Sequence, residues 1–266
     1  MLEVDTLIER ADRLRQLRRF DEARTAATQA LAQAPDDARA HRVLGEVELA
    51  SGDLDRAAEC AASAISAEPS VASHHLAARV ARRRGEMDGA VEHCRIAHGI
   101  DPDHAPVHVT ESLALSGPML HADRSGRFPV DETRWAAART AANRALELDP
   151  DLPSAHYASA VTHLLADRSL DAVRALERGL EIDPEWADGH VLLGAVRTRQ
   201  GMVKLASRHF AAAGRLEPGN DAHVDRLRSM RGRARSLVRR RPTRLPAHLS
   251  PEARAILARD DELGGR

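Results

Sequence analysis

Aromatic side chains are scarce in this sequence: phenylalanine, tryptophan and tyrosine together make up 2% of its 266 residues. Apolar residues as a whole make up 43%, so a core has to be built from alanine, leucine, valine and isoleucine. Small side chains bury little area each, and burial contributes roughly 25 cal/mol per Å². This composition favours many short helices that pack closely along a long line of contact.

Three other shortages narrow the class of protein. The sequence has two cysteines, Cys60 and Cys94, too few for a disulfide framework, which suits a reducing compartment. The N-terminus carries acidic residues early in place of the apolar stretch of a signal peptide. No window approaches the roughly 18 consecutive apolar residues of a membrane span. We therefore expect a cytoplasmic protein that is not a transmembrane protein.

Motifs that carry chemistry are also missing. The sequence has no phosphate-binding loop, no dinucleotide-binding glycine pattern, no nucleophile elbow, no H-E-x-x-H and no paired C-x-x-C. Cys94 and His98, and likewise His104 and His108, are each separated by one helical turn, but two ligands alone make a weak metal site. We predict no catalytic residue, no cofactor and no metal ion.

What the sequence does contain is a repeat of about 34 residues. Its markers are six prolines that follow an apolar and acidic phrase, at intervals of 34, 33, 48, 34 and 34 along the chain: Pro35, Pro69, Pro102, Pro150, Pro184 and Pro218. An alanine stands at the twelfth position before each of them: Ala23, Ala57, Ala90, Ala138, Ala172 and Ala206. A second small residue stands at the fifth position before each: Ala30, Ala64, Ala97, Ala145, Gly179 and Ala213. A single insertion in the fourth repeat explains the one long interval.

Each repeat is predicted to fold as two helices. In the second repeat, apolar residues recur at helical spacing up to Gly52 and again from Leu54 towards Pro69. Glycine ends a helix because it tolerates a positive φ, and proline ends one because it has no N–H to donate. The alanine at the twelfth position before each proline marks where the two helices approach closely.

Histidine recurs at the fourth position of five repeats, as His41, His74, His108, His156 and His190. Neighbouring helices lie about 8–10 Å apart, whereas two ligands of one zinc ion each lie about 2 Å from the metal. Equivalent histidines of successive repeats are therefore too far apart to share an ion. We predict that they are packing residues.

The pattern resembles the tetratricopeptide repeat family, on Leu44-Gly45, Leu193-Gly194, Phe210, the six alanines from Ala23 to Ala206 and the six prolines. The resemblance implies an all-α fold, a right-handed α-solenoid of about six helix-turn-helix repeats in residues 1–220. It places the insertion, near residues 118–130, between the two helices of the fourth repeat. A basic capping helix over residues 221–241 and a tail over 242–266, with a short helix near 251–260, would follow.

The resemblance also implies that the first helix of each repeat lines a concave groove. Carried over by position, the predicted groove residues are Asp5, Ile8, Asp12, Arg15, Arg39, Arg42, Glu46, His75, Arg79, Arg82, Val109, Leu113, Tyr157, Val161, Leu164, Val191 and Thr198. Such a groove is charged in its N-terminal half and mostly apolar in its C-terminal half. It would hold an extended or helical partner segment with an acidic end and an apolar end. The alternative is that these side chains are solvated, or covered by the chain's own tail.

The C-terminal region hides a charge asymmetry behind the net charge of −1. Residues 226–244 contain no acidic residue and nine arginines: Arg226, Arg228, Arg231, Arg233, Arg235, Arg239, Arg240, Arg241 and Arg244. The rest of the chain therefore carries a net charge of −10. A basic helix of this kind can bind nucleic acid, an anionic membrane surface or an acidic protein, or can be a capping helix with a solvated face.

Taken together, these features predict a non-enzymatic adaptor or scaffold that binds a protein or peptide segment in the groove. The alternative is a regulator that associates with nucleic acid or another polyanion through the arginine-rich C-terminal helix.

Overall fold

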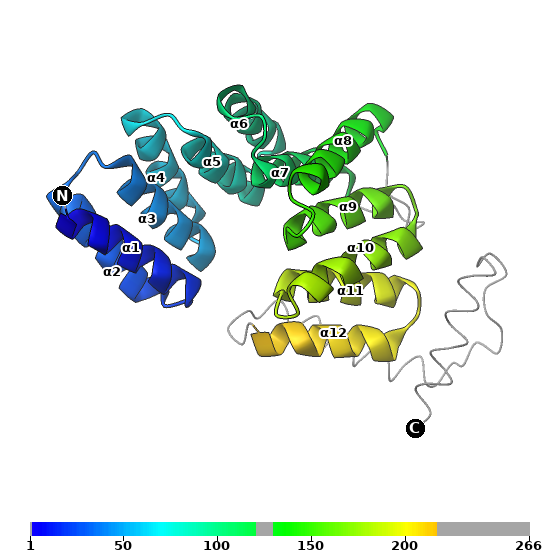
Figure 1. The fold of residues 1–266 in the computed structure, drawn as a ribbon. Helices are drawn as coiled ribbons and strands as arrows, with labels where there is room; N and C mark the ends of the chain where they lie inside the picture. The colour runs from blue at the N-terminus through cyan, green and yellow to red at the C-terminus, as the bar shows by residue number, and fades with distance from the viewer. Residues whose placement is uncertain (1, 121–129, 217–266) are drawn as a thin grey trace, which may run out of the picture. The chain divides into compact units, whose positions relative to one another are not determined.

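The computed structural model describes residues 2–120 and 130–216, and the chain divides into two compact units, Met1–Asp167 and Arg168–Arg266. Unit 1 contains α1 (Leu2–Gln16), α2 (Phe20–Gln33), α3 (Ala38–Ser51), α4 (Leu54–Ala67), α5 (Val71–Arg84), α6 (Met87–Ile100), α7 (Ala105–Ser116), the 3-10 turn η1 (Gly117–Met119), α8 (Glu132–Leu148) and α9 (Pro153–Leu165). Unit 2 contains α10 (Ser169–Ile182), α11 (Ala187–Arg199) and α12 (Val203–Leu216). The described residues form no β-strand, so the prediction of an all-α fold is confirmed (Figure 1).

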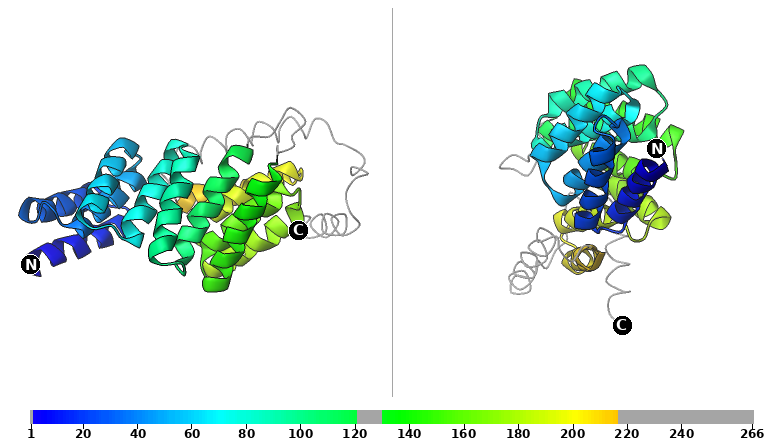
Figure 2. Two further views of the ribbon diagram at one scale, coloured as in Figure 1. Left: turned by 90° about the horizontal axis from the view of Figure 1, so that it is seen from above. Right: turned by 90° about the vertical axis from the view of Figure 1, so that its left-hand side faces the viewer.

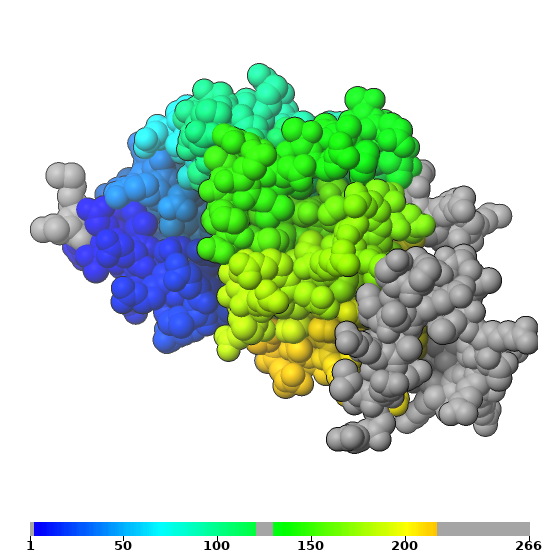
Figure 3. Space-filling model, turned by 45° about the vertical axis from the view of Figure 1, so that its right-hand side comes forward, coloured from blue at the N-terminus to red at the C-terminus, as the bar shows by residue number. Residues whose placement is uncertain are grey.

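Helices of unit 1 pack in two layers. Consecutive helices form the pairs α1–α2, α3–α4, α5–α6 and α7–α8, and each second helix also contacts the first helix of the next pair (Figures 1 and 2). The first helices α1, α3, α5, α7 and α9 also contact one another in chain order. The surface of unit 1 in Figure 3 passes in the same order from blue to green. In unit 2, α11 packs against both α10 and α12. This is the helical-hairpin repeat that the spacing of prolines and alanines predicts.

Small residues form the close contacts between helices. The alanine at the twelfth position before each repeat proline is fully buried in all six cases, and so is the alanine at the fifth position before five of them. Gly45 on α3 shows how close the helices come, since a Cβ there would lie 2.7 Å from Leu76 Cδ2. Leu76, Leu176 and Leu193 are among the largest fully buried side chains. Alanine thus sets the spacing of the helices, and leucine and valine fill the space that remains.

Helix ends follow the local sequence. Gly52, Gly85 and Gly201 adopt positive φ values of 94°, 83° and 78° after α3, α5 and α11, as left-handed helix ends require. Asp37 caps α3 and Asp53 caps α4 by accepting hydrogen bonds from backbone N–H groups of the first turn.

The turn between repeats is closed by a histidine. Its Nε2–H donates to the carbonyl of the proline six residues earlier, at 2.7 Å in His41, 2.8 Å in His108, 2.9 Å in His156 and 3.2 Å in His190. His74, the fifth member of the set, is buried, and its ring contacts His93 instead. The repeated histidine is therefore more than a packing residue, because it satisfies the carbonyl of a proline in the turn that follows the helix.

The predicted additions to the repeats fall mainly outside the described residues. The 3-10 turn η1 follows α7 and the next helix begins at Glu132, but residues 121–129, most of the predicted insertion, are not described. The predicted capping helix over 221–241 and the tail over 242–266 also lie outside the described residues. Within residues 2–120 and 130–216, no helix is both long enough and apolar enough to cross a membrane.

Candidate functional site

Charged side chains link the first helices of unit 1 across successive pairs. Arg39 on α3 forms an ion pair with Asp5 on α1, with Nη2 2.6 Å from Oδ1. One repeat later, Arg79 on α5 donates to both carboxylate oxygens of Glu46 on α3, at 2.7 and 2.6 Å. The partners are 34 and 33 residues apart, so the repeat period itself brings them side by side. These four predicted groove residues therefore share one face of the layer of first helices.

Other predicted groove residues add to this charged face. Arg15 pairs with Asp12 on α1 at 2.7 Å. Arg42 lies three residues after Arg39 and four before Glu46, which places it on the same face of α3, half-buried. In the described part of the chain Arg42 makes no ion pair. We call the charged predicted groove residues of α1, α3 and α5 the charged face; its members are Asp5, Asp12, Arg15, Arg39, Arg42, Glu46, Arg79 and Arg82.

Several predicted groove residues are core residues instead. Ile8, Val109, Val161 and Leu164 are each exposed by no more than 7%. Leu113 is half-buried and packs against the cluster around Val109. These side chains hold helices together, so the apolar half of the predicted groove offers less contact area than the sequence indicates. The position of a residue in the repeat predicts which face of the helix its side chain lies on. Whether that face is exposed depends on how closely the neighbouring helix packs.

The remaining predicted groove residues are polar or half-buried. Tyr157 on α9 is half-buried. In unit 2, Val191 packs against Ala206 and Phe210, and the hydroxyl of Thr198 donates to the carbonyl of Gly194 at 2.8 Å. Val191 therefore supports the core of unit 2.

His75 on α5 is held neutral by its surroundings. Its Nε2 donates to the hydroxyl of Thr110 on α7 at 3.0 Å, and that hydroxyl donates in turn to the carbonyl of Pro106 at 3.1 Å. Burial, together with the charge of Arg79, lowers the pKa of His75 to about 3. This predicted groove residue is therefore a neutral hydrogen-bond donor at pH 7 and not a cation.

A buried carboxylate joins the first two helix pairs. Glu48 on α3 is 1% exposed and accepts from Arg24 on α2 through two hydrogen bonds, of 2.8 and 2.9 Å. Arg56 on α4 lies 3.4 Å from the same carboxylate. The sequence gives little sign of this cluster, because its members come from three different helices.

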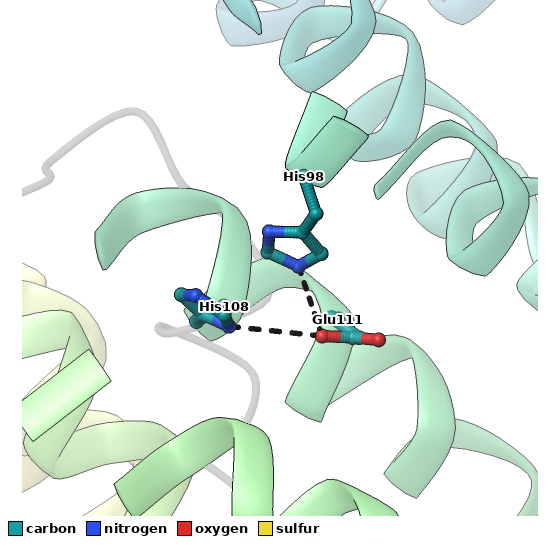
Figure 4. Close-up of side chains that lie close together, drawn as sticks. All are labelled: His98, His108 and Glu111. Atoms are coloured by element: carbon teal, nitrogen blue, oxygen red, sulfur yellow. Dashed lines mark hydrogen bonds and ion pairs between the residues drawn. The ribbon is translucent and has the colours of Figure 1, made fainter. Parts of the chain in front are cut away.

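Three polar side chains meet where α6 joins α7. His98 lies in the last turn of α6, and His108 and Glu111 lie one turn apart on α7 (Figure 4). Nε2 of His98 is 3.0 Å from Oε2 of Glu111, and Nδ1 of His108 is 3.8 Å from the same oxygen. The two imidazole rings stack with their centroids 4.1 Å apart. Burial lowers the pKa of His108, which disfavours the charged form of this ring.

The sequence analysis considered two pairs of possible metal ligands, Cys94 with His98 and His104 with His108. Neither pair lies together in this cluster. One member of each, His98 and His108, meets the other across the helix joint, whereas His104 contacts the ring of His75. Glu111 was not predicted from the sequence. The signal that would have found it is the spacing H-x-x-E at 108–111, which puts both side chains on one face of a helix.

The two cysteines are buried thiols. Cys60 and Cys94 are free, and burial raises their pKa values to about 11 and about 12. A thiolate is the reactive form of cysteine, so neither side chain is prepared for redox or nucleophilic chemistry.

Comparison with known proteins agrees with the repeat architecture. Residues 8–71, 47–105 and 130–187 match the family model described as Tetratricopeptide repeat. Among curated proteins, the TPR repeat-containing thioredoxin TTL4 of Arabidopsis thaliana is 24% identical over 123 residues. That match covers 46% of this chain, and the chain spans 18% of that protein's length.

Solved structures give the same result for the fold. TTC0263, a thermophilic repeat protein of Thermus thermophilus, is similar with a TM-score of 0.60 and 20% identity, over 73% of this chain and 98% of that one. A chain of the APC/C hetero-tetramer Cut9-Hcn1 is similar with a TM-score of 0.66 and 14% identity, over 86% of this chain and 43% of the other. The family matches cover more than half of the sequence. This chain belongs to the tetratricopeptide repeat family.

Proposed function

We propose that the chain is a non-enzymatic adaptor that binds an acidic segment of a partner protein along the charged face of unit 1. Repeats of this family generally mediate protein–protein interaction, which supports the class of function. The choice of an acidic partner rests on the excess of positive charge on the charged face, which carries five arginines and three carboxylates. A segment with several carboxylates would complement that excess.

The ion pair between Arg39 and Asp5 does not prevent such binding. The side chains of Arg39 and Asp5 are 58% and 43% exposed, and exposed pairs contribute only about 0–1 kcal/mol. A partner carboxylate can therefore replace Asp5 at little cost. Arg42 needs no such exchange, because it forms no ion pair within residues 2–120 and 130–216. It is the side chain that carries this proposal.

The partner-binding role is tested by reversing the charge of Arg42. Affinity capture from a native cell extract, with wild-type protein and Arg42→Glu side by side, identifies the proteins whose recovery depends on the charged face. The recovered partner's acidic segment is then titrated by calorimetry. We expect Arg42→Glu to weaken binding at least about tenfold, which corresponds to about 1.4 kcal/mol. Arg10→Glu is the matched control, since Arg10 is exposed on the opposite side of α1 and carries the same charge change.

The arginine-rich C-terminal segment supports a second candidate, association with nucleic acid or another polyanion. Binding through the segment would disappear when residues 226–266 are deleted and would fall steeply with salt, whereas Arg42→Glu would leave it intact. Binding that survives this deletion and is lost with Arg42→Glu supports the charged face.

We also propose a cytoplasmic location, because both cysteines are free and a reducing compartment keeps them so.

A further inference from the structure

We propose that His98, His108 and Glu111 form a binding site for one first-row divalent transition metal ion, with zinc as the reference ion. Each of these residues offers one potential ligand atom, and the three atoms lie within 4.8 Å of one another (Figure 4). The proposal is independent of the adaptor function, since none of these residues belongs to the charged face.

The distances fit an ion held between the three side chains. Ligand atoms about 2.0–2.1 Å from zinc in tetrahedral geometry are about 3.4 Å apart. The two distances to Glu111 Oε2, 3.0 Å from His98 and 3.8 Å from His108, lie on either side of that value. Both separations therefore differ from that value by about 0.4 Å.

One of the two histidines already has the tautomer that a metal needs. His108 uses Nε2–H to donate to the carbonyl of Pro102 at 2.8 Å, which leaves Nδ1, the nitrogen 3.8 Å from Oε2 of Glu111, to bind an ion. A hydrogen bond from the other ring nitrogen to a backbone carbonyl is the usual support of a metal-binding histidine. A cation bound at this nitrogen would also be attracted by the carboxylate of Glu111 beside it.

His98 is less well prepared. In the structure its Nε2–H donates to Glu111, so binding a metal through Nε2 moves the proton to Nδ1. That nitrogen is buried and has no hydrogen-bond partner within the described residues. Loss of such outer support typically lowers metal affinity about 10–100-fold. We therefore expect binding that is weaker than in a fully supported structural zinc site.

The site is reachable from solvent. His108 and Glu111 line a surface groove of about 540 Å³, whose other wall is formed by α8 residues that include Thr140 and Arg144. The cation of Arg144 is compensated by Asp103 at 2.6 Å and Glu147 at 3.2 Å, so it repels an approaching ion only weakly. The groove gives the ion an entry path and leaves its fourth coordination position to water.

The ligand types select the class of ion. Two imidazoles and one carboxylate suit zinc, nickel, cobalt or copper, whereas magnesium and calcium prefer oxygen ligands alone. The other close histidine pairs, His74–His93 and His190–His209, have Nδ1 atoms 3.2 and 3.1 Å apart. Within the described residues neither pair is joined by a third ligand, and each is explained by one nitrogen donating to the other.

The experiment is a calorimetric titration of the full chain with zinc chloride. We expect one ion per chain, and at least about tenfold weaker binding in His98→Gln, in His108→Gln and in Glu111→Gln. His156→Gln is the matched control, because His156 closes its own turn with the same hydrogen bond to a proline carbonyl but has no further ligand beside it among the described residues. Its zinc affinity should equal that of the wild type.

Glu111→Gln keeps an amide oxygen that accepts from His98, so the variant should fold, and its circular dichroism and Tm check this. Cobalt is a second probe, since its visible absorption on nitrogen and oxygen ligands should appear with the wild type and be absent with Glu111→Gln. The proposal is overturned if the wild type binds no zinc, or if His108→Gln and Glu111→Gln bind it as tightly as His156→Gln.

Discussion

Replacing Arg24 with methionine should leave the buried carboxylate of Glu48 without its main partner. Arg24 holds both oxygens of Glu48 at 2.8 and 2.9 Å, and these hydrogen bonds raise the pKa of Arg24 above its usual value. Removing one partner of a buried ion pair typically costs about 3–5 kcal/mol in the free energy of unfolding. Arg56 stays 3.4 Å from the carboxylate, so we expect a cost near the lower end, about 3 kcal/mol.

The double variant Arg24→Met with Glu48→Leu removes both charges and keeps the volume. Replacing a buried ion pair by well-packed apolar side chains is often neutral or stabilising, so the double variant should recover most of the lost stability. Urea unfolding followed by circular dichroism measures both. Arg19→Met is the control, because Arg19 makes a bidentate pair with Glu22, at 2.6 Å for both hydrogen bonds, that is about half-exposed. This substitution should cost less than about 1 kcal/mol. The reasoning fails if Arg24→Met costs no more than Arg19→Met, or if the double variant is as unstable as the single one.

Burial and close packing lead to three further predictions, on the pH dependence of stability, on the stability of glycine variants and on the reactivity of the thiols. The pKa of His75 is about 3 in the folded chain and about 6.5 when unfolded, so the unfolded state binds the extra proton and stability falls as the pH drops below about 6.5. The loss from this residue is about 2 kcal/mol at pH 5, and urea unfolding of His75→Gln should show a flatter pH profile than the wild type; equal profiles would contradict the assignment. Gly45→Ala should lower the free energy of unfolding by about 1–3 kcal/mol, because the new Cβ would lie 2.7 Å from a methyl group of Leu76. Gly89→Ala is the control: no atom lies near the new Cβ, so the substitution should raise the free energy of unfolding by about 0.5–1 kcal/mol. Cys60 and Cys94 should react with a thiol reagent at pH 8 only after urea unfolds the chain, and fast labelling of the native protein would show that the thiols are not buried.

The fold was predictable because its signals are local. The spacing of alanine and proline fixes where helices begin, end and approach, and the full burial of Ala23, Ala90 and Ala206 confirms that interpretation. Two cross-helix ion pairs were predictable in principle, since their members are one repeat apart. Which groove residues are open was not predictable, because the burial of Ile8 and Val161 depends on how closely the neighbouring helix packs.

The cluster of His98, His108 and Glu111 was also not predicted from the sequence. His98 and Glu111 lie on different helices, and they meet where α6 joins α7. The buried pair of Arg24 and Glu48 is similar, since a charged residue inside a core has no sequence pattern of its own. Contacts of this kind are set by the packing of side chains, which the repeat period does not encode.

The histidine that donates to a proline carbonyl six residues earlier has a consequence for how the gene can change. The histidine and the proline lie within seven consecutive residues. A duplicated block of about 34 residues that spans one turn therefore contains both partners of this hydrogen bond, and the bond requires no compensating substitution in the neighbouring blocks. The stretches LELDPDLPSAH at 146–156 and LEIDPEWADGH at 180–190, one block apart, share the Leu, Glu, Asp-Pro and closing His of such a turn. We expect arrays of this type to lengthen or shorten by whole blocks more readily than they tolerate the loss of a single turn residue.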